Sequence, residues 1–351
     1  MSPASIKILD GNAASSIAIA AELIKSGELL GLPTETVYGL AADAHNADAV
    51  AKIFIAKGRP ADHPLIVHVL DAASVTHFAS SVPDFAASLM AAFWPGPLTV
   101  ILPRQEKVAA AAAGGQNSIG LRSPSHPVAQ ALLRECLVST GEDARQVWGI
   151  AAPSANKFGR VSPTTAAHVQ SEFGDALSVL DGGPCDVGIE STIIDCTRGV
   201  PVLLRPGAIT VEQVQAVCGQ KVLSNDEMLA QTAPAPRASG TLESHYAPNA
   251  RVHLLDAQGL QAALDLMRTD AVGAQSNSPL IATYSRTPLK TATTSVLRKR
   301  MPDSAAETAQ QLFAVLRDFD DQGVKAIWVE TPPNTPEWDG VRDRLQRAAA
   351  G

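Results

Sequence analysis

Two short polar clusters in this chain carry side chains that suit the binding of a polyanion. Lys57-Gly58-Arg59 ends a helix-like run that begins at Ala47, and Ser154-Ala155-Asn156 follows the apolar, strand-like segment 148–152. An arginine binds phosphate oxygens through two parallel hydrogen bonds, and a lysine adds a mobile point charge. The clusters therefore point to phosphate chemistry, such as binding of a nucleoside triphosphate, without a P-loop. Taken alone, a solvated helix end with cations at its C-terminal dipole is the alternative.

The composition is that of an ordinary globular chain, and its 351 residues favour two domains over one. Hydrophobic residues make up 46% and charged residues 18%, a balance that can bury a large core. The net charge of -7 argues against a general nucleic-acid coat but allows a local basic cleft. The four cysteines form no CxxC pair, so neither a disulfide framework nor a zinc site is supported. Because we find no signal-peptide core and no membrane-length apolar run, we expect a cytoplasmic protein with no membrane partner.

The elements that position these clusters are expected in a mixed α/β domain over residues 1–217. Short apolar strands alternate there with helix-like stretches. The strands are predicted at 28–32, 65–69, 98–102, 118–122, 191–196 and 200–205, and the helices at 47–57, 85–94 and 127–137. Ser162 is placed to cap a helix whose first residue is Pro163, and Thr210 with Gln213 fits a capping box.

A change of composition follows this domain. Residues 218–250 are predicted to be a linker, because 232–240 contain two prolines, small residues and little periodicity. A smaller domain is expected over 251–351, with strands at 252–255, 280–284 and 326–330 and with helices between them. This alternation predicts a parallel, Rossmann-like sheet. The domain has no GxGxxG sequence, so a dinucleotide site there is not favoured.

Six segments occur in an order that is far more specific than any one of them. They are PTETVYGL at 33–40, KGRPADHPLIVHV at 57–69, FWPGPLT at 93–99, APSAN at 152–156, GIESTI at 188–193 and SHYAP at 244–248. Together they resemble the YrdC-like family in its two-domain form, the threonylcarbamoyl-AMP synthases. The resemblance implies the substrates ATP, L-threonine and bicarbonate, with Mg²⁺ on the ATP phosphates. It also implies that threonylcarbamoyl-AMP, released with pyrophosphate, passes to the machinery that transfers the threonylcarbamoyl group to tRNA.

The resemblance assigns the ATP end of the site mainly to cations and hydroxyl groups. Lys57 and Arg59 are the catalytic candidates, because nucleotidyl transfer needs positioning and charge stabilisation more than a protein nucleophile. Ser154 and Asn156 are implied as their partners. Further ATP contacts are implied at His63, Ser118, Ser162, Arg205 and Tyr246.

Three of these ATP assignments have alternatives. His63 stands where the family commonly has Asn, although an imidazole can still donate to phosphate or ribose. Ser162 could act as a helix cap, and a capped helix start also presents free N–H groups to an anion. Tyr246 is implied to lie against the nucleotide when the linker folds over the site. A residue that anchors the linker to the body of the protein is the alternative for Tyr246.

The threonine end of the site is built around an arginine. Arg122 ends the apolar strand 118–122 and can clamp the α-carboxylate of threonine through two hydrogen bonds. The resemblance places Thr36, His68, Ala152 and Ser191 around the same pocket, with Ala152 setting its shape. A surface ion pair is the alternative for Arg122, and a half-buried strand position is the alternative for His68. No metal ligand is expected from protein side chains.

Two other functions were weighed against the synthase. An RNA-binding module of the same fold is disfavoured by the aromatic content of 4% and by the lack of a strong basic run. Carbamoyl transfer in hydrogenase maturation would bring zinc-finger and acylphosphatase-like segments, which this sequence does not show. Basic residues between Arg286 and Arg300 fit a solvated surface better than a tRNA or partner contact, and direct tRNA binding stays open.

Overall fold

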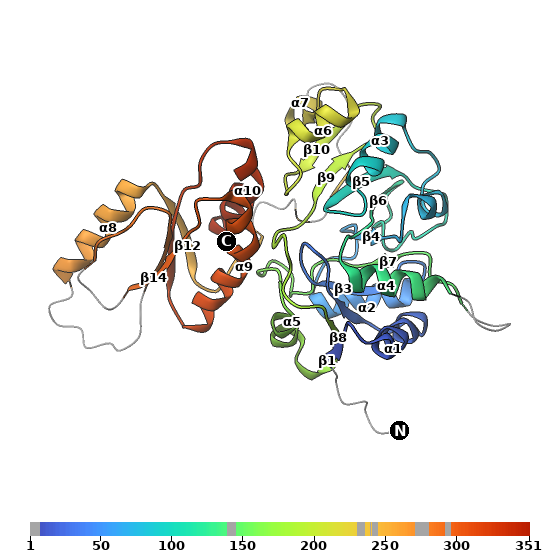
Figure 1. Ribbon diagram of the computed structural model, residues 1–351, viewed down its shortest axis with the longest axis horizontal. Coiled ribbons are helices and arrows are strands. Elements are labelled where there is room, and N and C mark those ends of the chain that lie inside the picture. The colour runs from blue at the N-terminus through green and yellow to red at the C-terminus, as the bar shows by residue number, and fades with distance from the viewer. Residues whose placement is uncertain are drawn as a thin grey trace. The chain divides into compact units, whose positions relative to one another are not determined.

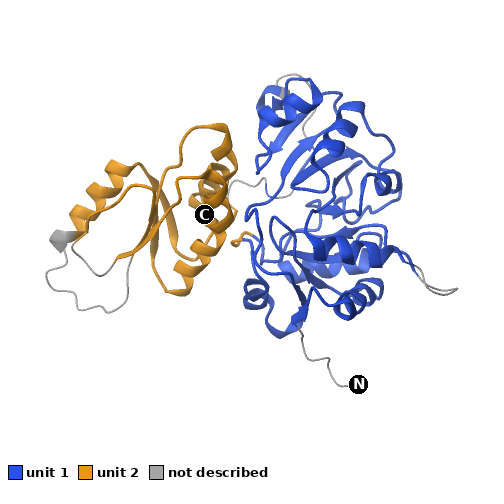
Figure 2. Cartoon of the chain, in the orientation of Figure 1, with its two compact units in different colours: residues 1–158, 162–241 blue, residues 159–161, 242–351 orange. Residues whose placement is uncertain are grey.

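The computed structural model divides the chain into two compact units (Figures 1 and 2). It describes residues 8–138, 145–229, 236–238, 240, 245–270, 281–291 and 296–351. Unit 1 comprises residues 1–158 and 162–241, and unit 2 comprises residues 159–161 and 242–351. Within the predicted linker, residues 230–235, 239 and 241–244 lie outside the described residues. No helix in the described part of the chain is long and apolar enough to cross a membrane.

The described strands of unit 1 form one mixed sheet, as predicted for an α/β domain. Its order is β1-β8-β2-β3-β7-β4-β6-β5-β9-β10-β11. The strands are β1 (Ile8–Asp10), β2 (Leu30–Leu32), β3 (Gly39–Asp43), β4 (Ile66–His68), β5 (Leu98–Pro103), β6 (Ser118–Arg122), β7 (Ile150–Ala151), β8 (Ser178–Asp181), β9 (Thr192–Asp195), β10 (Val202–Arg205) and β11 (Leu223–Ser224). The sequence did not predict β3, because Gly-Leu-Ala-Ala-Asp lacks the β-branched and aromatic residues that favour strands.

The helices of unit 1 follow local sequence signals closely. They are α1 (Ala14–Lys25), α2 (Ala47–Lys57), α3 (Asp84–Phe93), α4 (Pro127–Leu137), α5 (Ala166–Phe173), α6 (Val211–Cys218) and α7 (Asn225–Leu229), with 3-10 turns η1 (Ala72–His77) and η2 (Gly174–Ala176). The capping box of Thr210 and Gln213 at α6 is confirmed. The predicted cap at Ser162 is wrong: α5 begins at Ala166, where the Thr165 side chain accepts from the N–H of His168.

Helix α2 places Lys57 in the interior, because local sequence signals define where the helix begins and ends. Asn46 caps its start by accepting from the N–H groups of Asp48 and Ala49. Gly58 ends it in the left-handed conformation, with φ of 66°, which glycine adopts without a steric penalty. Lys57 therefore occupies the last turn on the buried face of the helix.

The strand register brings the threonine-end residues to one edge of the sheet. β4 and β6 are parallel, and His68 at the end of β4 pairs with Arg122 at the end of β6. β5 runs antiparallel to β6, and this register places Thr99 next to Arg122. β5 also runs parallel to β9, where Leu98 pairs with Thr192. Polar side chains at the ends of three neighbouring strands thus converge where open α/β sheets bind ligands.

Unit 2 contains a four-stranded sheet whose paired strands are all parallel, which confirms the predicted Rossmann-like arrangement. Its order is β12-β15-β13-β14. The elements are β12 (Arg251–Leu255), α8 (Ala257–Asp270), β13 (Ile281–Ser285), β14 (Val296–Arg300), α9 (Ala305–Asp321), β15 (Ala326–Glu330), η3 (Pro336–Trp338) and α10 (Asp339–Ala349). The apolar face of α9 is buried, as its helical spacing predicted.

Candidate functional site

Lys57 is buried at the end of α2, and its ammonium group faces the main chain of the 154–156 segment. The residue is 3% exposed, and Nζ donates to the carbonyl oxygens of Ser154 and Asn156, both at 2.5 Å. Burial, together with the neighbouring guanidinium of Arg59, holds the pKa of Lys57 well below its usual range. The solvated helix end is therefore wrong for this residue. An anionic ligand would favour the charged form of Lys57 and raise its pKa again.

The loop after Lys57 closes onto the same segment. Arg59 is buried, and its Nη2 donates to the carbonyl oxygen of Pro64 at 2.9 Å. The ring of His63 lies 5.7 Å from that of Phe158, measured between centroids, and the N–H of Phe158 donates to the carbonyl oxygen of Lys57. Burial and the charge of Arg59 lower the pKa of His63. The structure thus brings Lys57, Arg59, His63, Ser154 and Asn156 together, as the sequence predicted.

The other residues assigned to ATP in unit 1 are more dispersed. Ser162 is buried and donates to Oε1 of Glu190 at 2.5 Å. Arg205 is buried, and its Nε and Nη2 donate to the carbonyl oxygen of Ser191 at 3.1 and 2.9 Å. Ser162 and Arg205 therefore converge on the neighbouring residues Glu190 and Ser191. Ser118 lies at the start of β6, about 13 Å from Arg122 at the strand rise of about 3.3 Å per residue.

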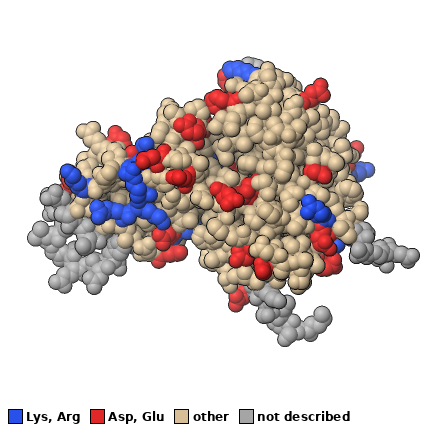
Figure 3. All heavy atoms as spheres, viewed as in Figure 1, with Lys and Arg blue, Asp and Glu red and all other residues tan. Residues whose placement is uncertain are grey.

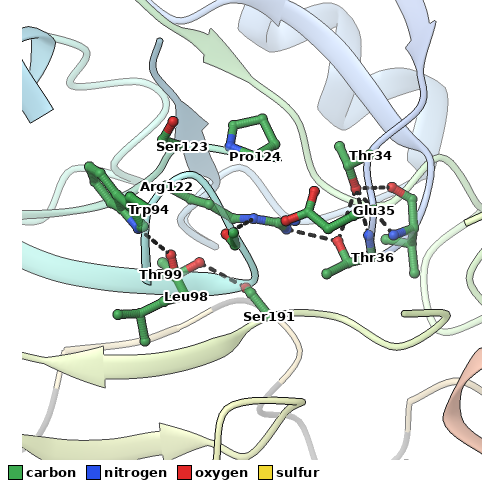
Figure 4. Close-up of polar contacts among 12 residues, drawn as sticks. Thr34, Glu35, Thr36, Trp94, Leu98, Thr99, Arg122, Ser123, Pro124 and Ser191 are labelled. Carbon is green, nitrogen blue, oxygen red and sulfur yellow. Dashed lines mark hydrogen bonds and ion pairs between the residues drawn. The ribbon is translucent and has the colours of Figure 1, made fainter. Parts of the chain in front are cut away.

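Arg122 is buried in a set of polar contacts that Figure 4 shows. Its Nη1 donates to Oγ1 of Thr36 at 2.8 Å, and its Nε donates to the carbonyl oxygen of Gly96 at 3.2 Å. Its Nη2 lies 2.7 Å from Oε1 of Glu35. Arg122 is 4% exposed, so the surface ion pair considered above is wrong. The guanidinium is held by three different groups before any ligand arrives.

A tight turn at residues 34–37 fixes the hydroxyl of Thr36. Oγ1 of Thr34 donates to the carbonyl oxygen of Val37 at 2.6 Å and accepts from the N–H groups of Thr36 and Val37. The two hydroxyl oxygens of Thr34 and Thr36 are 2.9 Å apart. Since the Thr34 proton is used for Val37, Thr36 donates to Thr34 and accepts from Arg122. This turn sets the direction of Thr36 toward the guanidinium.

His68 lies beside Arg122 as a neutral imidazole. It is 3% exposed, so the half-buried alternative is also wrong. Burial and the charge of Arg122 lower the pKa of His68 to about 3. Among the described residues, its Nδ1 atom has no hydrogen-bond partner. At neutral pH the ring can therefore offer a ligand a hydrogen bond without adding charge.

Ala152 and Ser191 complete the predicted threonine set. Ala152 is buried, and a side chain at Gly39 would come within 2.9 Å of its Cβ, so the absence of one lets β3 approach closely. Ser191 is buried, with its Oγ 2.8 Å from Oγ1 of Thr99. The polar contacts of Ser191 reach both Thr99 beside Arg122 and Arg205 of the ATP set.

One extended segment of unit 1 joins the two ends of the site. Thr36 contacts Arg122 at the threonine end. Two residues later, the carbonyl oxygen of Tyr38 accepts from the N–H of Ala155 at 2.8 Å, and the N–H of Leu40 donates to Pro153. The 153–156 segment in turn holds Lys57. The cation at each end is thus connected to the other through a short stretch of buried main chain.

Two buried acids of the site, Glu35 and Glu190, were not predicted from the sequence. Glu35 pairs with Arg122, and Glu190 accepts from Ser162. Both lie inside motifs that were recognised, Glu35 between two threonines and Glu190 directly before Ser191. The signal that could have found them is a carboxylate within a segment otherwise made of apolar and hydroxyl residues, where a charge is expensive unless it has a partner.

Tyr246 belongs to unit 2 and is not among the residues that unit 1 brings together. Its ring is fully buried, with the ring of Phe313 at 5.4 Å between centroids and the guanidinium of Arg344 at 5.3 Å. Packing of this kind fits an aromatic anchor within unit 2. Contact of Tyr246 with the nucleotide stays a prediction.

Metal ligands and reactive thiols are not features of the described residues. They contain no group of three or more His, Cys, Asp or Glu side chains that could hold a metal ion. All four cysteines are free thiols. Burial raises the pKa of Cys136 to about 12 and also raises the pKa values of Cys185 and Cys196, which makes these thiols poor nucleophiles at neutral pH.

Comparisons with known proteins cover nearly the whole chain. A family model described as "Telomere recombination" matches residues 22–207, and one described as "Threonylcarbamoyl-AMP synthase, C-terminal domain" matches residues 209–350. The threonylcarbamoyl-AMP synthase of Bacillus subtilis (strain 168) is 38% identical over 341 residues, covering 95% of this chain and 93% of the relative. That of Pyrococcus abyssi (strain GE5 / Orsay) is 36% identical over 345 residues, covering 95% and 94%.

A solved structure agrees with these relatives. The crystal structure of P. abyssi Sua5 complexed with L-threonine matches with a TM-score of 0.83 at 33% identity, covering 98% of this chain and 97% of that one. The agreement extends over both units, as do the matching family models. This chain therefore belongs to the two-domain threonylcarbamoyl-AMP synthase family.

Proposed function

We propose that unit 1 converts L-threonine, bicarbonate and ATP into threonylcarbamoyl-AMP and pyrophosphate. The observation that carries this proposal is the pair of buried cations, Lys57 and Arg122, joined through the buried segment 36–40. Such an arrangement suits a ligand with a phosphate tail at one end and an amino-acid carboxylate at the other. The names of the relatives and the threonine complex of P. abyssi Sua5 support the same assignment.

The chemistry divides into two displacements. The amino nitrogen of threonine attacks the carbon of bicarbonate, water leaves, and a carbamate forms with release of a proton. An oxygen of the new carboxylate then attacks the α-phosphorus of ATP, and the bond to the β-phosphate oxygen breaks to release pyrophosphate. Lys57 and Arg59 would stabilise the negative charge on the phosphates, and Arg122 would hold the threonine carboxylate. Neither step requires a protein nucleophile.

Mg²⁺ is expected to enter on the ATP phosphates, since this hard cation prefers phosphate and water oxygens, and it would supply charge neutralisation there. No protein side chain is assigned to the metal. Chelation with EDTA should therefore abolish pyrophosphate formation while the affinity for threonine, measured by calorimetry, stays the same. Loss of threonine binding on chelation would contradict this placement of the metal.

The product would supply the machinery that transfers a threonylcarbamoyl group to tRNA. The purified chain should be incubated with ATP, radiolabelled bicarbonate and a panel of amino acids, and pyrophosphate and labelled adenylate should be measured. We expect both products, with a marked preference for threonine. Tight RNA binding without release of pyrophosphate would contradict the proposal and favour the binding module instead.

A further inference from the structure

Glu35 is a buried carboxylate whose hydrogen-bonding capacity is not fully used. It is 4% exposed, and Oε1 lies 2.7 Å from Nη2 of Arg122. Apart from this ion pair, neither carboxylate oxygen has a hydrogen-bond partner of good geometry among the described residues. An ionised carboxylate has about four acceptor positions, and leaving them unfilled in the interior costs free energy. Such a group suits a ligand that brings N–H donors.

The charge on Glu35 persists at neutral pH despite its burial. Burial disfavours the ionised form, but the guanidinium of Arg122, helped by the N–H groups of Glu35 and Ser125, outweighs it and lowers the pKa of Glu35. In Figure 4 the side chains of Glu35 and Arg122 point toward one another, with Thr36 beside them. A carboxylate and a guanidinium therefore stand together at the threonine end of the site.

An α-amino acid carries two opposite charges, and the residues assigned to threonine from the sequence supply only one counter-charge. Arg122 suits the carboxylate. Thr36 and Ser191 are neutral hydroxyls, and His68 is a neutral imidazole whose pKa is about 3. The ammonium group of the substrate would then enter this buried end of the site without an anion, at a high desolvation cost. Glu35 is the acid in direct contact with Arg122.

We propose that Glu35 binds the α-ammonium group of the incoming amino acid, so that the Glu35–Arg122 pair recognises both charges of the zwitterion. This inference rests on the proposed function and adds a binding residue to the same site. Before the amino acid binds, Arg122 holds Glu35 in its ionised form. The ammonium group then fills the acceptor positions that the protein leaves open, while the threonine carboxylate takes N–H groups of Arg122.

The competing reading is that Glu35 only orients Arg122. The two readings differ for a ligand that has the threonine carboxylate and hydroxyl but no amino group. If Glu35 binds the ammonium group, a ligand without an amino group leaves the Glu35 carboxylate without its donor. Such a ligand should bind weakly, as happens when a buried polar group loses its partner. If Glu35 only positions Arg122, the loss of Glu35 should weaken both ligands alike, because both use Arg122.

The test is a calorimetric titration of the full chain with L-threonine and with 3-hydroxybutanoate, in which a hydrogen atom replaces the amino group. We expect Glu35→Gln to weaken threonine binding roughly 10- to 100-fold, the loss typical of a charge-assisted hydrogen bond. Binding of 3-hydroxybutanoate should change less than about 3-fold, since it offers Glu35 no donor in place of the ammonium group. The preference of the wild type for threonine should then largely disappear.

Glu330→Gln is the matched control. Glu330 is also 4% exposed and also pairs with an arginine, Nη2 of Arg286 at 2.9 Å, but it lies in unit 2. This variant should bind both ligands like the wild type. Glu35→Asp, which keeps the charge on a shorter side chain, should recover part of the preference for threonine. Circular dichroism checks that each variant is folded. The preference of the wild type for threonine over the second ligand can be measured without any variant.

Three results would overturn the inference. Glu35→Gln could weaken both ligands equally, which would make Glu35 a positioning residue for Arg122. The wild type could bind 3-hydroxybutanoate as well as threonine, which would show that the ammonium group is not recognised. If the wild type bound no threonine at all, the proposed function would fail as well, and this result is distinct from the first two.

Discussion

The cations of the two units differ in their surroundings more than in their number. In unit 1, four cations of the candidate site are between 2% and 8% exposed and reach carbonyl oxygens or a carboxylate: Lys57, Arg59, Arg122 and Arg205. In unit 2, the basic run 298–300 is exposed on β14. Figure 3 shows basic side chains gathered on one part of the visible face, whereas acidic groups are scattered over that face. The cations of the candidate site are thus buried, whereas the basic run of β14 is exposed.

The physical reason for this difference is the cost of removing a charge from water. A buried cation persists only where carbonyl oxygens, a carboxylate or a ligand compensate for lost hydration. An exposed cation on an edge strand costs little and discourages pairing with another strand. Arg300 is paired with Asp303 at 3.0 Å, and Lys299 lies 3.8 Å from Asp318, which also reduces the free charge on β14.

The largest expected effect comes from removing the cation at the phosphate end. Lys57→Ala should lower the rate of pyrophosphate release roughly 100-fold or more, the scale seen when one charge-stabilising donor is lost. Threonine affinity should change little, because Lys57 contacts the 154–156 segment and not Arg122. Steady-state kinetics and calorimetry check the two parts. Arg298→Ala in unit 2 is the control. If this variant lost as much of the rate of pyrophosphate release as Lys57→Ala, the proposed difference between buried and exposed cations would be wrong.

The next largest effect should come from the threonine end. Arg122→Ala removes the carboxylate clamp and leaves Glu35 as an unpaired buried charge, which costs about 3–5 kcal/mol where one partner of a buried pair is lost. We expect threonine affinity to fall beyond detection by calorimetry and the unfolding midpoint to drop. ATP affinity should be nearly unchanged. Equal, small effects of Arg122→Ala and Lys57→Ala on both substrates would contradict the division of roles.

A smaller effect concerns the pH dependence of stability. The pKa of His68 is about 3 in the folded chain, against about 6.5 for an unperturbed histidine. Between these values the unfolded state binds a proton that the folded state does not, so this residue makes stability fall as the pH drops below about 6.5. The slope reaches about 1.4 kcal/mol per pH unit. His68→Gln should therefore weaken the pH dependence of the unfolding midpoint between pH 6.5 and 4.5. Identical slopes of midpoint against pH for the variant and the wild type would refute this account.

The smallest effect is expected on the exposed edge of unit 2. Replacing Arg298, Lys299 and Arg300 together by alanine should leave pyrophosphate release within about 2-fold of the wild type, since exposed charges contribute little. Gel filtration should instead show more self-association, because the edge loses the charges that oppose strand pairing. A large fall in activity with no change in association would show that exposed charge also serves the reaction.

Much of this contrast could be predicted from the sequence, and the rest depends on tertiary contacts. Asn46 and Gly58 define α2 locally, so the position of Lys57 at its end followed from short-range signals. Arg122 was correctly placed at the end of a strand. Its pairing with Glu35, however, joins residues far apart in the chain and appears only when β6 and the 34–37 turn are brought together. Ser162 looked like a cap, but its hydroxyl is bound to Glu190.

The short segment 159–161 makes the two units harder to separate than they would be if the predicted linker were their one connection. It belongs to unit 2, although residues on both sides of it belong to unit 1. Within unit 2, the carbonyl oxygen of Gly159 accepts from Ala247 at 2.9 Å, and Arg160 pairs with Asp320 at 3.3 Å. Truncation after residue 241 would therefore remove these contacts of Gly159 and Arg160, between Asn156 and Ser162. An isolated catalytic fragment could lose ATP turnover through this internal damage, even if unit 2 takes no part in the reaction.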